Sequence, residues 1–190
     1  MMLIRDRDLT IRKMKDAGTD YALMLHWLTD DRVAEHYGGR DQKFTLEKIK
    51  EKYGRKIREF AHMTPCIIER SRKPIGYLQF YETCRDGEPT GKEPLLWLAS
   101  GTYNVDMFIG EPDLWNRGIG NTVLRMTAQH LLQNGSAKVV TIDPKTVNER
   151  AIRAYEKAGF RKVQLLPKWE EHEGKWYDNW LMQYEPNTNA

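Results

Sequence analysis

The chain has 190 residues, of which 40% are hydrophobic and 30% charged, a composition typical of a globular protein rather than a disordered one. Its formal net charge of +3 is too small to favour nucleic acid or a membrane surface as a partner. The charged start, residues 1–8, lacks the apolar stretch of a signal peptide, and no later run approaches a membrane span in length. We therefore expect a cytoplasmic protein with a single domain over residues 1–190, in which residues 185–190 form a flexible tail.

The chain contains 2 cysteines and 5 histidines. Cys66 and Cys84 are too few for a disulfide framework, and each lies in a strand-like segment where a small buried thiol is the ordinary explanation. The histidines show no metal-ligand spacing with either cysteine or with one another. We therefore expect neither a metal centre nor a catalytic cysteine.

The first third of the chain begins with a strand and continues mainly as helix. Residues 8–14 alternate apolar with polar side chains, as in a half-buried strand. We expect Asp20 to cap a helix over residues 21–28, and Asp30 and Asp31 to open a second, short helix that stops at residues 38–39.

A third helix follows. Apolar side chains recur at helical spacing from Leu46 to Phe60, directly behind the capping residue Thr45. The spacing predicts an amphipathic helix of about four turns.

The middle of the chain changes to short apolar runs. Residues 65–69 and 75–81 are separated by the turn sequence of residues 71–74, which predicts a hairpin of two antiparallel strands. Residues 84–92 combine glycine and proline with charges and should form a loop, before another strand over residues 103–109.

Beyond residue 109, strands and helices alternate. We expect a helix capped by Asn148 and ended by Gly159, because asparagine and glycine are favoured at these two positions. The expected elements are helices over residues 118–132 and 148–158, and strands over residues 138–142, 162–166 and 176–184. This alternation predicts an α/β fold around one mixed sheet.

The segment Arg117-Gly118-Ile119-Gly120-Asn121 lies between a predicted strand and a long helix. Glycine lets backbone N–H groups approach a ligand closely, the helix N-terminus adds partial positive charge, and Arg117 adds a full charge. The segment therefore suits a pyrophosphate, although packing or capping alone can also explain a GxG at a helix start.

A second segment, Asn148-Glu149-Arg150-Ala151-Ile152-Arg153-Ala154-Tyr155-Glu156-Lys157-Ala158-Gly159-Phe160, resembles the acyl-CoA N-acyltransferase (GNAT) superfamily. That superfamily carries a glycine-containing pyrophosphate loop after its fourth strand and N-x-x-A-x-x-x-Y-x-K-x-G-F after its fifth. Both occur here in that order, although Trp115 stands where the family loop usually has Gln or Arg. The resemblance implies a GNAT-type fold, with a central mixed sheet of about seven strands flanked by helices.

The resemblance also implies a cosubstrate, acetyl-CoA, and its contacts. The strand over residues 105–109 would pair with the pantetheine arm, and Tyr155 would protonate the departing thiolate, a role that suits a neutral phenol. The implied cofactor-binding residues are Met107, Phe108, Ile109, Arg117, Gly118, Ile119, Gly120, Asn121, Asn148 and Tyr155.

Four further segments resemble the aminoglycoside 6′-N-acetyltransferases within that superfamily. They are His36-Tyr37-Gly38-Gly39, Ile75-Gly76-Tyr77-Leu78-Gln79-Phe80-Tyr81, Val105-Asp106 and Thr141-Ile142-Asp143-Pro144. A polycationic sugar needs carboxylates for its ammonium groups and aromatic faces for its rings. The resemblance implies that the substrate-binding residues are Tyr37, Gln79, Tyr81, Asp86, Asp106 and Asp143.

The implied reaction is direct attack of the amine on the thioester, with Asp106 accepting the proton of the ammonium. Two other readings stay open: acetylation of another amine, on a ribosomal-protein N-terminus or a polyamine, and a non-catalytic acetyl-CoA-binding protein. The acidic run at Glu170, Glu171 and Glu173 is either a rim of the site or a solvated face. We expect a monomer or homodimer that takes an aminoglycoside and acetyl-CoA, with no nucleic-acid or membrane partner.

Overall fold

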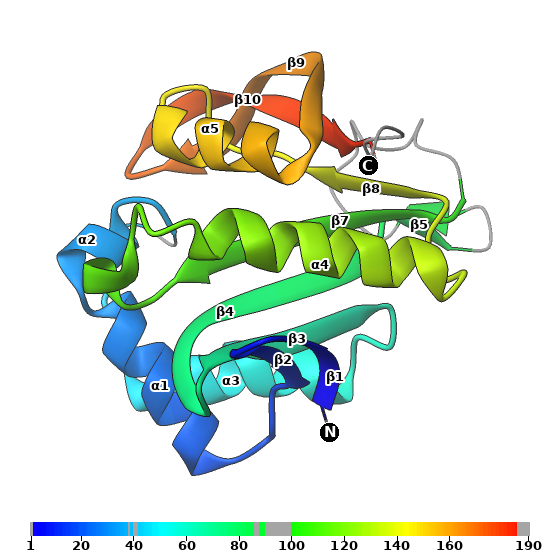
Figure 1. Cartoon of the computed structure of the whole chain (residues 1–190). Coiled ribbons are helices and arrows are strands. Elements are labelled where there is room, and N and C mark those ends of the chain that lie inside the picture. The colour runs from blue at the N-terminus through cyan, green and yellow to red at the C-terminus, as the bar shows by residue number, and fades with distance from the viewer. Residues whose placement is uncertain (1, 38, 40–41, 86–87, 90–99, 186–190) are drawn as a thin grey trace. The chain divides into compact units, whose positions relative to one another are not determined.

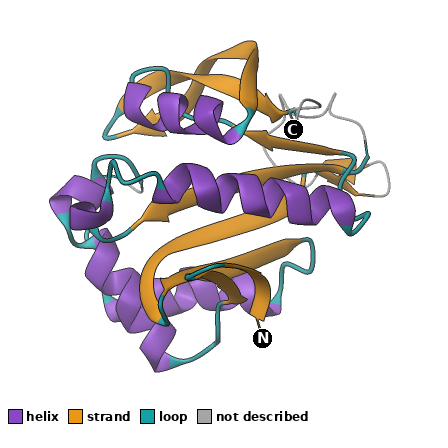
Figure 2. Ribbon diagram, viewed as in Figure 1, coloured by secondary structure: helices purple, strands orange, loops and turns teal. Residues whose placement is uncertain are grey.

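The computed structural model describes residues 2–37, 39, 42–85, 88–89 and 100–185 as an α/β fold (Figures 1 and 2). The helices are α1 (Gly18–Leu28), α2 (Asp31–Ala34), α3 (Leu46–Arg58), the 3-10 helix η2 (Pro112–Leu114), α4 (Ile119–Gln133) and α5 (Glu149–Ala158). The strands are β1 (Met2–Asp6), β2 (Leu9–Lys13), β3 (Met63–Arg70), β4 (Lys73–Glu82), β5 (Cys84–Arg85), β6 (Glu88–Pro89), β7 (Thr102–Ile109), β8 (Val139–Ile142), β9 (Phe160–His172) and β10 (Lys175–Tyr184).

The main sheet has eight strands, one more than the expected seven or so. Strands β7 and β8 run parallel, whereas β10 pairs antiparallel with both β8 and β9. The sheet is therefore mixed, and the expected α/β fold is confirmed.

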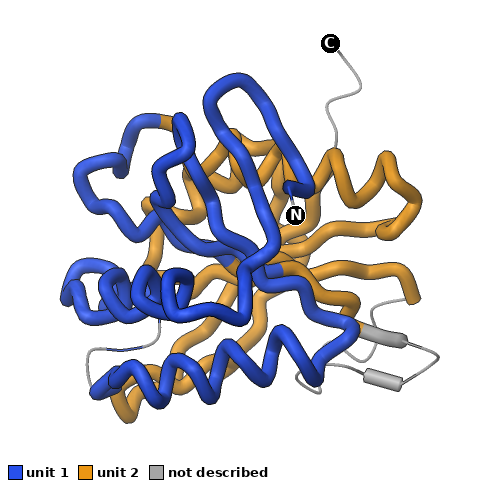
Figure 3. Tube along the Cα trace, turned by 90° about the horizontal axis from the view of Figure 1, so that it is seen from below, with its two compact units in different colours: residues 1–79, 107–117 blue, residues 80–106, 118–190 orange. Residues whose placement is uncertain are grey.

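The chain divides into two compact units (Figure 3). Unit 1 comprises residues 1–79 and 107–117, and unit 2 comprises residues 80–106 and 118–190. The expected single domain over residues 1–190 stays a prediction.

Unit 1 holds β1, β2, β3 and most of β4, with β2 pairing antiparallel to both β1 and β3. Its core is aromatic: Trp27, Tyr53 and Tyr77 are fully buried, and Phe108 meets Trp27 edge to face with ring centroids 6.0 Å apart. A Cβ atom at Gly110 would lie 2.3 Å from Cγ of Trp27. The close approach of the backbone to this indole therefore requires glycine at position 110.

Unit 2 contains most of β7 together with β8, β10 and β9, which follow one another in that order in the sheet. Helix α4 packs against β8 and α5, and α5 packs against β9. Val105, Leu124 and Val140 are fully buried, so the apolar faces of the helix and the strands close this core.

Most expected elements are confirmed, because their end signals act locally. Thr45 caps α3 through its side chain, Asp30 caps α2, and Gly159 ends α5 in the left-handed conformation at φ 103°. The turn between β3 and β4 is made by Ser71 and Arg72, both with positive φ.

Three details differ from the expectation. Strand β1 was not expected; its five residues are stabilised as a strand by antiparallel pairing with β2. Residues 84–92 were expected to be a loop, yet β5 and β6 pair antiparallel within them. Strand β9 extends to His172, well beyond the expected end at residue 166, because β10 provides hydrogen-bond partners along its length.

The expected end of the second helix at residues 38–39 is also wrong, since α2 ends at Ala34. Cys66 is buried as expected, and burial raises the pKa of its thiol to about 12, so it is not poised for nucleophilic chemistry. Among the described residues, no helix is both long enough and apolar enough to cross a membrane.

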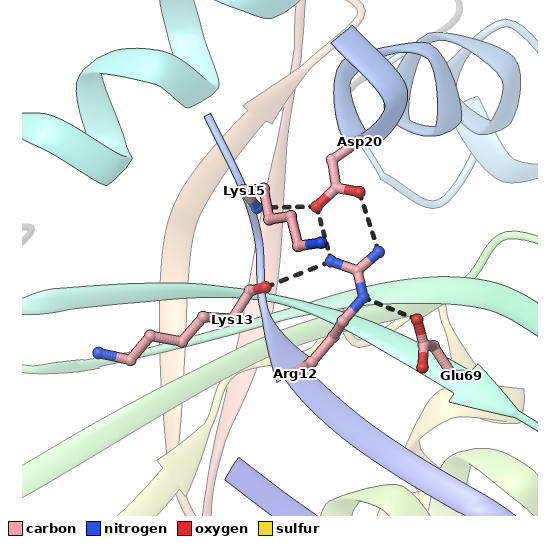
Figure 4. A network of polar contacts seen from close by, with 5 residues as sticks. All are labelled: Arg12, Lys13, Lys15, Asp20 and Glu69. Carbon is pink, nitrogen blue, oxygen red and sulfur yellow. Dashed lines mark hydrogen bonds and ion pairs between the residues drawn. The ribbon is translucent and has the colours of Figure 1, made fainter. Parts of the chain in front are cut away.

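The expected capping role of Asp20 is wrong. Helix α1 begins at Gly18, with Ala17 as its N-cap, and Asp20 is a buried residue of the first turn. Its carboxylate accepts hydrogen bonds from Nη1 and Nη2 of Arg12, at 2.7 and 2.9 Å, and from the backbone N–H of Lys15 at 2.7 Å (Figure 4). Arg12 also donates to Glu69 at 2.7 Å, so the three side chains join β2, β3 and α1 within unit 1.

We predict that Asp20→Asn lowers the free energy of unfolding by about 3 kcal/mol at pH 7, the usual scale for breaking a buried ion pair. Burial raises the pKa of Asp20, but the hydrogen bonds from Arg12 and Lys15 outweigh it and leave that pKa below its ordinary value. The ion pair therefore stabilises the wild type at pH above about 4, and this stabilisation is lost as the pH falls further.

Urea unfolding of both proteins between pH 3 and pH 7 measures this difference. The matched control is Asp8→Asn, which breaks the more exposed pair of Asp8 with Arg70 and should change stability far less. Equal losses for the two variants at pH 7 would contradict the structural role of Asp20.

Candidate active site

Helix α4 begins at a glycine turn that leaves its first amides accessible. Gly118 is the N-cap in the left-handed conformation, at φ 75°, a conformation that favours glycine. A Cβ atom at Gly120 would meet no heavy atom within 4 Å, so open space lies beside this residue. The first amides of a helix have no intrahelical acceptor, and the first turn of α4 contains no acidic residue. This helix start can therefore receive an anion.

Two side chains of the preceding loop were singled out from the sequence. Arg117 is exposed, as a residue that contacts a soluble anion must be before binding. Trp115 donates a hydrogen bond from Nε1 to the backbone carbonyl of Ile109 at 2.8 Å, and its ring lies 6.3 Å from that of His36. Trp115 therefore anchors this loop within unit 1.

Helix α5 places two candidate residues. Asn148 caps the helix, because its Oδ1 accepts a hydrogen bond from the backbone N–H of Ala151 at 3.1 Å. Tyr155 lies two turns further along and is half-buried. Burial raises the pKa of Tyr155, and the negative charges of Asp106 and Asp143 raise it further, so the phenol is protonated at neutral pH.

The two candidate carboxylates lie where the parallel pairing of β7 and β8 stops. The recorded ladder runs from Thr102 opposite Val139 to Asn104 opposite Thr141. Asp106 and Asp143 each follow the last pair by two residues, so the same register would place them side by side. Both are half-buried.

Tyr81 belongs to the same neighbourhood. Burial raises the pKa of its phenol well above the ordinary value, and the charges of Asp106 and Asp143 add to that effect. Unit 2 therefore brings together four of the residues singled out from the sequence, two carboxylates and two protonated phenols.

Asn104 forms hydrogen bonds with two members of this group, Tyr81 and Asp143, and it was not singled out from the sequence. Its Nδ2 donates to the hydroxyl of Tyr81 at 3.0 Å and to Oδ1 of Asp143 at 2.9 Å. Nε1 of Trp169 donates to the other carboxylate oxygen, Oδ2 of Asp143, at 2.6 Å. A signal was present in the sequence: Asn104 is a polar residue two positions before Asp106 in the same strand, and so lies on the same face.

Asn179 was also missed. It is fully buried on β10, and its Nδ2 donates to the backbone carbonyl of Asp143 at 2.6 Å. This bond holds the segment that follows β8 against β10.

The acidic run near the end of the chain is part of a hairpin. Glu170 lies on β9 and pairs with Lys145 at 3.6 Å, and Glu173 lies in the turn after His172. The ion pair of Glu170 favours a structural, solvated role for this residue over a role in substrate binding.

Two other candidates lie in unit 1. Tyr37 is half-buried and packs on Phe108, with ring centroids 4.7 Å apart. Gln79 is 5% exposed, and its Oε1 accepts hydrogen bonds from Nζ of Lys56 at 2.8 Å and from the hydroxyl of Tyr77 at 2.7 Å. Both side chains take part in the packing of unit 1, and their contacts with a substrate stay predictions.

Four candidates remain: Met107, Phe108, Ile109 and Asp86. The side chains of Phe108 and Ile109 are buried and that of Met107 is half-buried, so any contact of Phe108 and Ile109 with a cofactor would use their backbone. Asp86 lies outside the described residues. Within the described part of the chain, no group of three or more His, Cys, Asp or Glu side chains is placed to hold a metal ion.

Comparisons with known proteins agree on the family. A family model described as an acetyltransferase (GNAT) domain matches residues 16–167. The aminoglycoside N(6′)-acetyltransferases type 1 of Klebsiella pneumoniae and Serratia marcescens are each 29% identical to this chain over 154 residues, which cover 81% of this chain and 74% of theirs.

A solved structure of AAC(6′)-Ib in complex with ribostamycin and coenzyme A is also similar. It has a TM-score of 0.77 and 25% sequence identity, over 97% of this chain and 99% of that one. Because the family model spans most of the chain, including the helix start at Gly118 and the motif around Tyr155, this chain belongs to the GNAT acetyltransferase family.

Proposed function

We propose that this protein transfers the acetyl group of acetyl-CoA to the 6′-amine of aminoglycoside antibiotics and so confers resistance to them. The observation that carries the proposal is the pair of carboxylates, Asp106 and Asp143, at the end of the β7–β8 ladder beside the protonated phenol of Tyr155. The similarity over 154 residues to aminoglycoside N(6′)-acetyltransferases supports the substrate class.

The start of α4 fits the pyrophosphate of acetyl-CoA. Gly118 turns the chain, the space beside Gly120 is open, and the first-turn amides of the helix face no acidic neighbour on their own turn. Arg117, exposed in the preceding loop, would add a full positive charge. When bound, acetyl-CoA supplies an acetyl group activated as a thioester.

The carboxylates would bind and deprotonate the amine. An aminoglycoside ammonium is attracted to Asp106 and Asp143, because charge-assisted hydrogen bonds are strongest to ionised acceptors. Asp106 would accept the proton of the ammonium, directly or through a water, which frees the nitrogen lone pair for attack.

Tyr155 would complete the proton balance. The sulfur that leaves the acetyl group needs a proton, and the raised pKa of Tyr155 keeps its hydroxyl available as a donor. In this proposal the amine attacks the thioester directly, without an acyl-cysteine step, and burial holds the thiol of Cys66 protonated.

The substrate class is tested by measuring CoA release with four amine acceptors. We predict turnover with kanamycin, and none with an aminoglycoside that carries a 6′-hydroxyl in place of the amine, because a hydroxyl is a far poorer nucleophile. Spermidine and a peptide with a free N-terminus test the two other amine classes. Turnover of either of these without turnover of kanamycin would contradict the proposal.

The cofactor site is tested by calorimetry with acetyl-CoA. We predict that Gly120→Leu weakens binding by about tenfold or more, because its side chain would occupy the open space where the pyrophosphate binds. Gly18→Leu is the matched control, since Gly18 also opens a helix and its added Cβ also meets no atom within 4 Å. Equal affinities of the two variants, or no heat with the wild type at millimolar acetyl-CoA, would contradict this site.

The two catalytic side chains are tested by Asp106→Asn and Tyr155→Phe. Each should lower kcat for kanamycin by about 100-fold, the ordinary contribution of a general base or acid, and Asp106→Asn should leave the Kd of acetyl-CoA unchanged. Glu149→Gln, which removes an exposed carboxylate from the helix of Tyr155, should leave kcat unchanged. Since Tyr155 acts in its protonated form and its pKa is raised, its deprotonation should not limit the wild-type rate below about pH 10. Retained turnover in either variant would remove that residue from the mechanism.

A further inference from the structure

Asn104 is a buried polar residue at the end of the β7–β8 ladder. Its exposed fraction is 1%, and its neighbour Val105 is fully buried. An amide buried in a core is costly unless each of its polar atoms has a partner. The partners of Asn104 therefore indicate what the side chain does.

The amide uses both its donor and its acceptor. Nδ2 donates to Tyr81 and to Asp143, and Oδ1 accepts a hydrogen bond from Oγ1 of Thr141 at 2.9 Å. An ionised carboxylate can only accept, so the NH2 end of the amide must face Asp143. The orientation of the side chain follows from this network.

The network also restrains Asp143. Its two carboxylate oxygens accept from Asn104 and from Trp169, and its backbone carbonyl accepts from Asn179. The amide of Asn104 and the indole of Trp169 are neutral donors, which orient a carboxylate without cancelling its charge. Asp143 is accordingly one of the charges that raise the pKa of both Tyr81 and Tyr155.

We propose that Asn104 is a positioning residue, which orients the carboxylate of Asp143 and the hydroxyl of Tyr81 for the substrate ammonium. The inference rests on the proposed function, because it assigns Asn104 a role toward the amine substrate of the same site. Asn104 acts through these two side chains and does not itself take part in proton transfer.

The first experiment compares Asn104→Leu with Thr141→Val in steady-state kinetics with kanamycin and acetyl-CoA. Asn104→Leu removes the bonds to Asp143 and Tyr81, whereas Thr141→Val removes a bond to the same amide and leaves both of these in place. We expect Asn104→Leu to raise the KM for kanamycin by about tenfold or more, with an unchanged KM for acetyl-CoA. Thr141→Val should change both constants by less than about twofold, and thermal unfolding compares the stabilities of the variants.

The second experiment uses Asn104→Asp, which keeps the shape of the side chain. The introduced carboxyl would face Asp143, so one pKa of the pair is raised and a shared proton can replace the lost hydrogen bond at low pH. As the pH rises, that proton is lost and the two charges repel. The ratio of kcat/KM for kanamycin, variant over wild type, should therefore fall between pH 5.5 and pH 8.5, whereas the ratio for Thr141→Val should be flat.

The outcomes separate the two proposals. If the wild type turns over kanamycin but Asn104→Leu matches Thr141→Val, or the Asn104→Asp ratio is independent of pH, the positioning role is overturned and the proposed function stands. If the wild type binds acetyl-CoA but does not acetylate kanamycin, the proposed function fails and this inference fails with it. If Asn104→Leu does not fold, the pH dependence of Asn104→Asp decides the question alone.

Discussion

The end of the parallel ladder between β7 and β8 is the constraint on which the candidate site depends. The two strands pair as far as Asn104 and Thr141, and a carboxylate, Asp106 or Asp143, follows two residues later in each segment. Parallel neighbours end at the same edge of a sheet, so residues some 37 positions apart in the chain, Asp106 and Asp143, come to one place. Their negative charges raise the pKa of the phenols of Tyr81, on β4, and Tyr155, on α5.

The electrostatics of this group suit an acid and a base in one site. Burial disfavours the ionisation of a phenol, and neighbouring negative charges act in the same direction. Tyr155 is thus kept as a proton donor by its burial and, in addition, by the carboxylates that would attract a cationic amine. The same group of side chains therefore offers a neutral phenol as a proton donor and carboxylates as candidate proton acceptors.

The start of α4 uses a different principle, in which the backbone rather than the side chains forms the ligand site. Amides at a helix N-terminus point along the axis without an acceptor, and their dipoles sum to a partial positive charge. Gly118 provides the left-handed turn that begins the helix, and Gly120 leaves the approach open. Trp115 stands where the family usually has a polar residue, and its indole N–H anchors the loop by a hydrogen bond to the backbone carbonyl of Ile109.

Local signals in the sequence predict the helices and most strands, because capping residues, turn residues and hydrophobic period act over a few positions. Thr45 and Asn148 begin their helices, and Gly159 ends its helix, as expected. The sequence also determined the family, because the motif around Tyr155 is local. Three features could not be predicted from it: the pairing of β1 with β2, the ion pair of Asp20 with Arg12 in place of helix capping, and the network of Asn104 with Asp143 and Trp169. The pairing of β1 with β2 and the ion pair of Arg12 with Asp20 join nearby residues, but each depends on which strand or helix lies beside β2. The bonds of Asp143 join residues 39 and 26 positions apart, and although the sequence marks Asn104 as a polar residue on the face of Asp106, it does not identify the partners of Asn104.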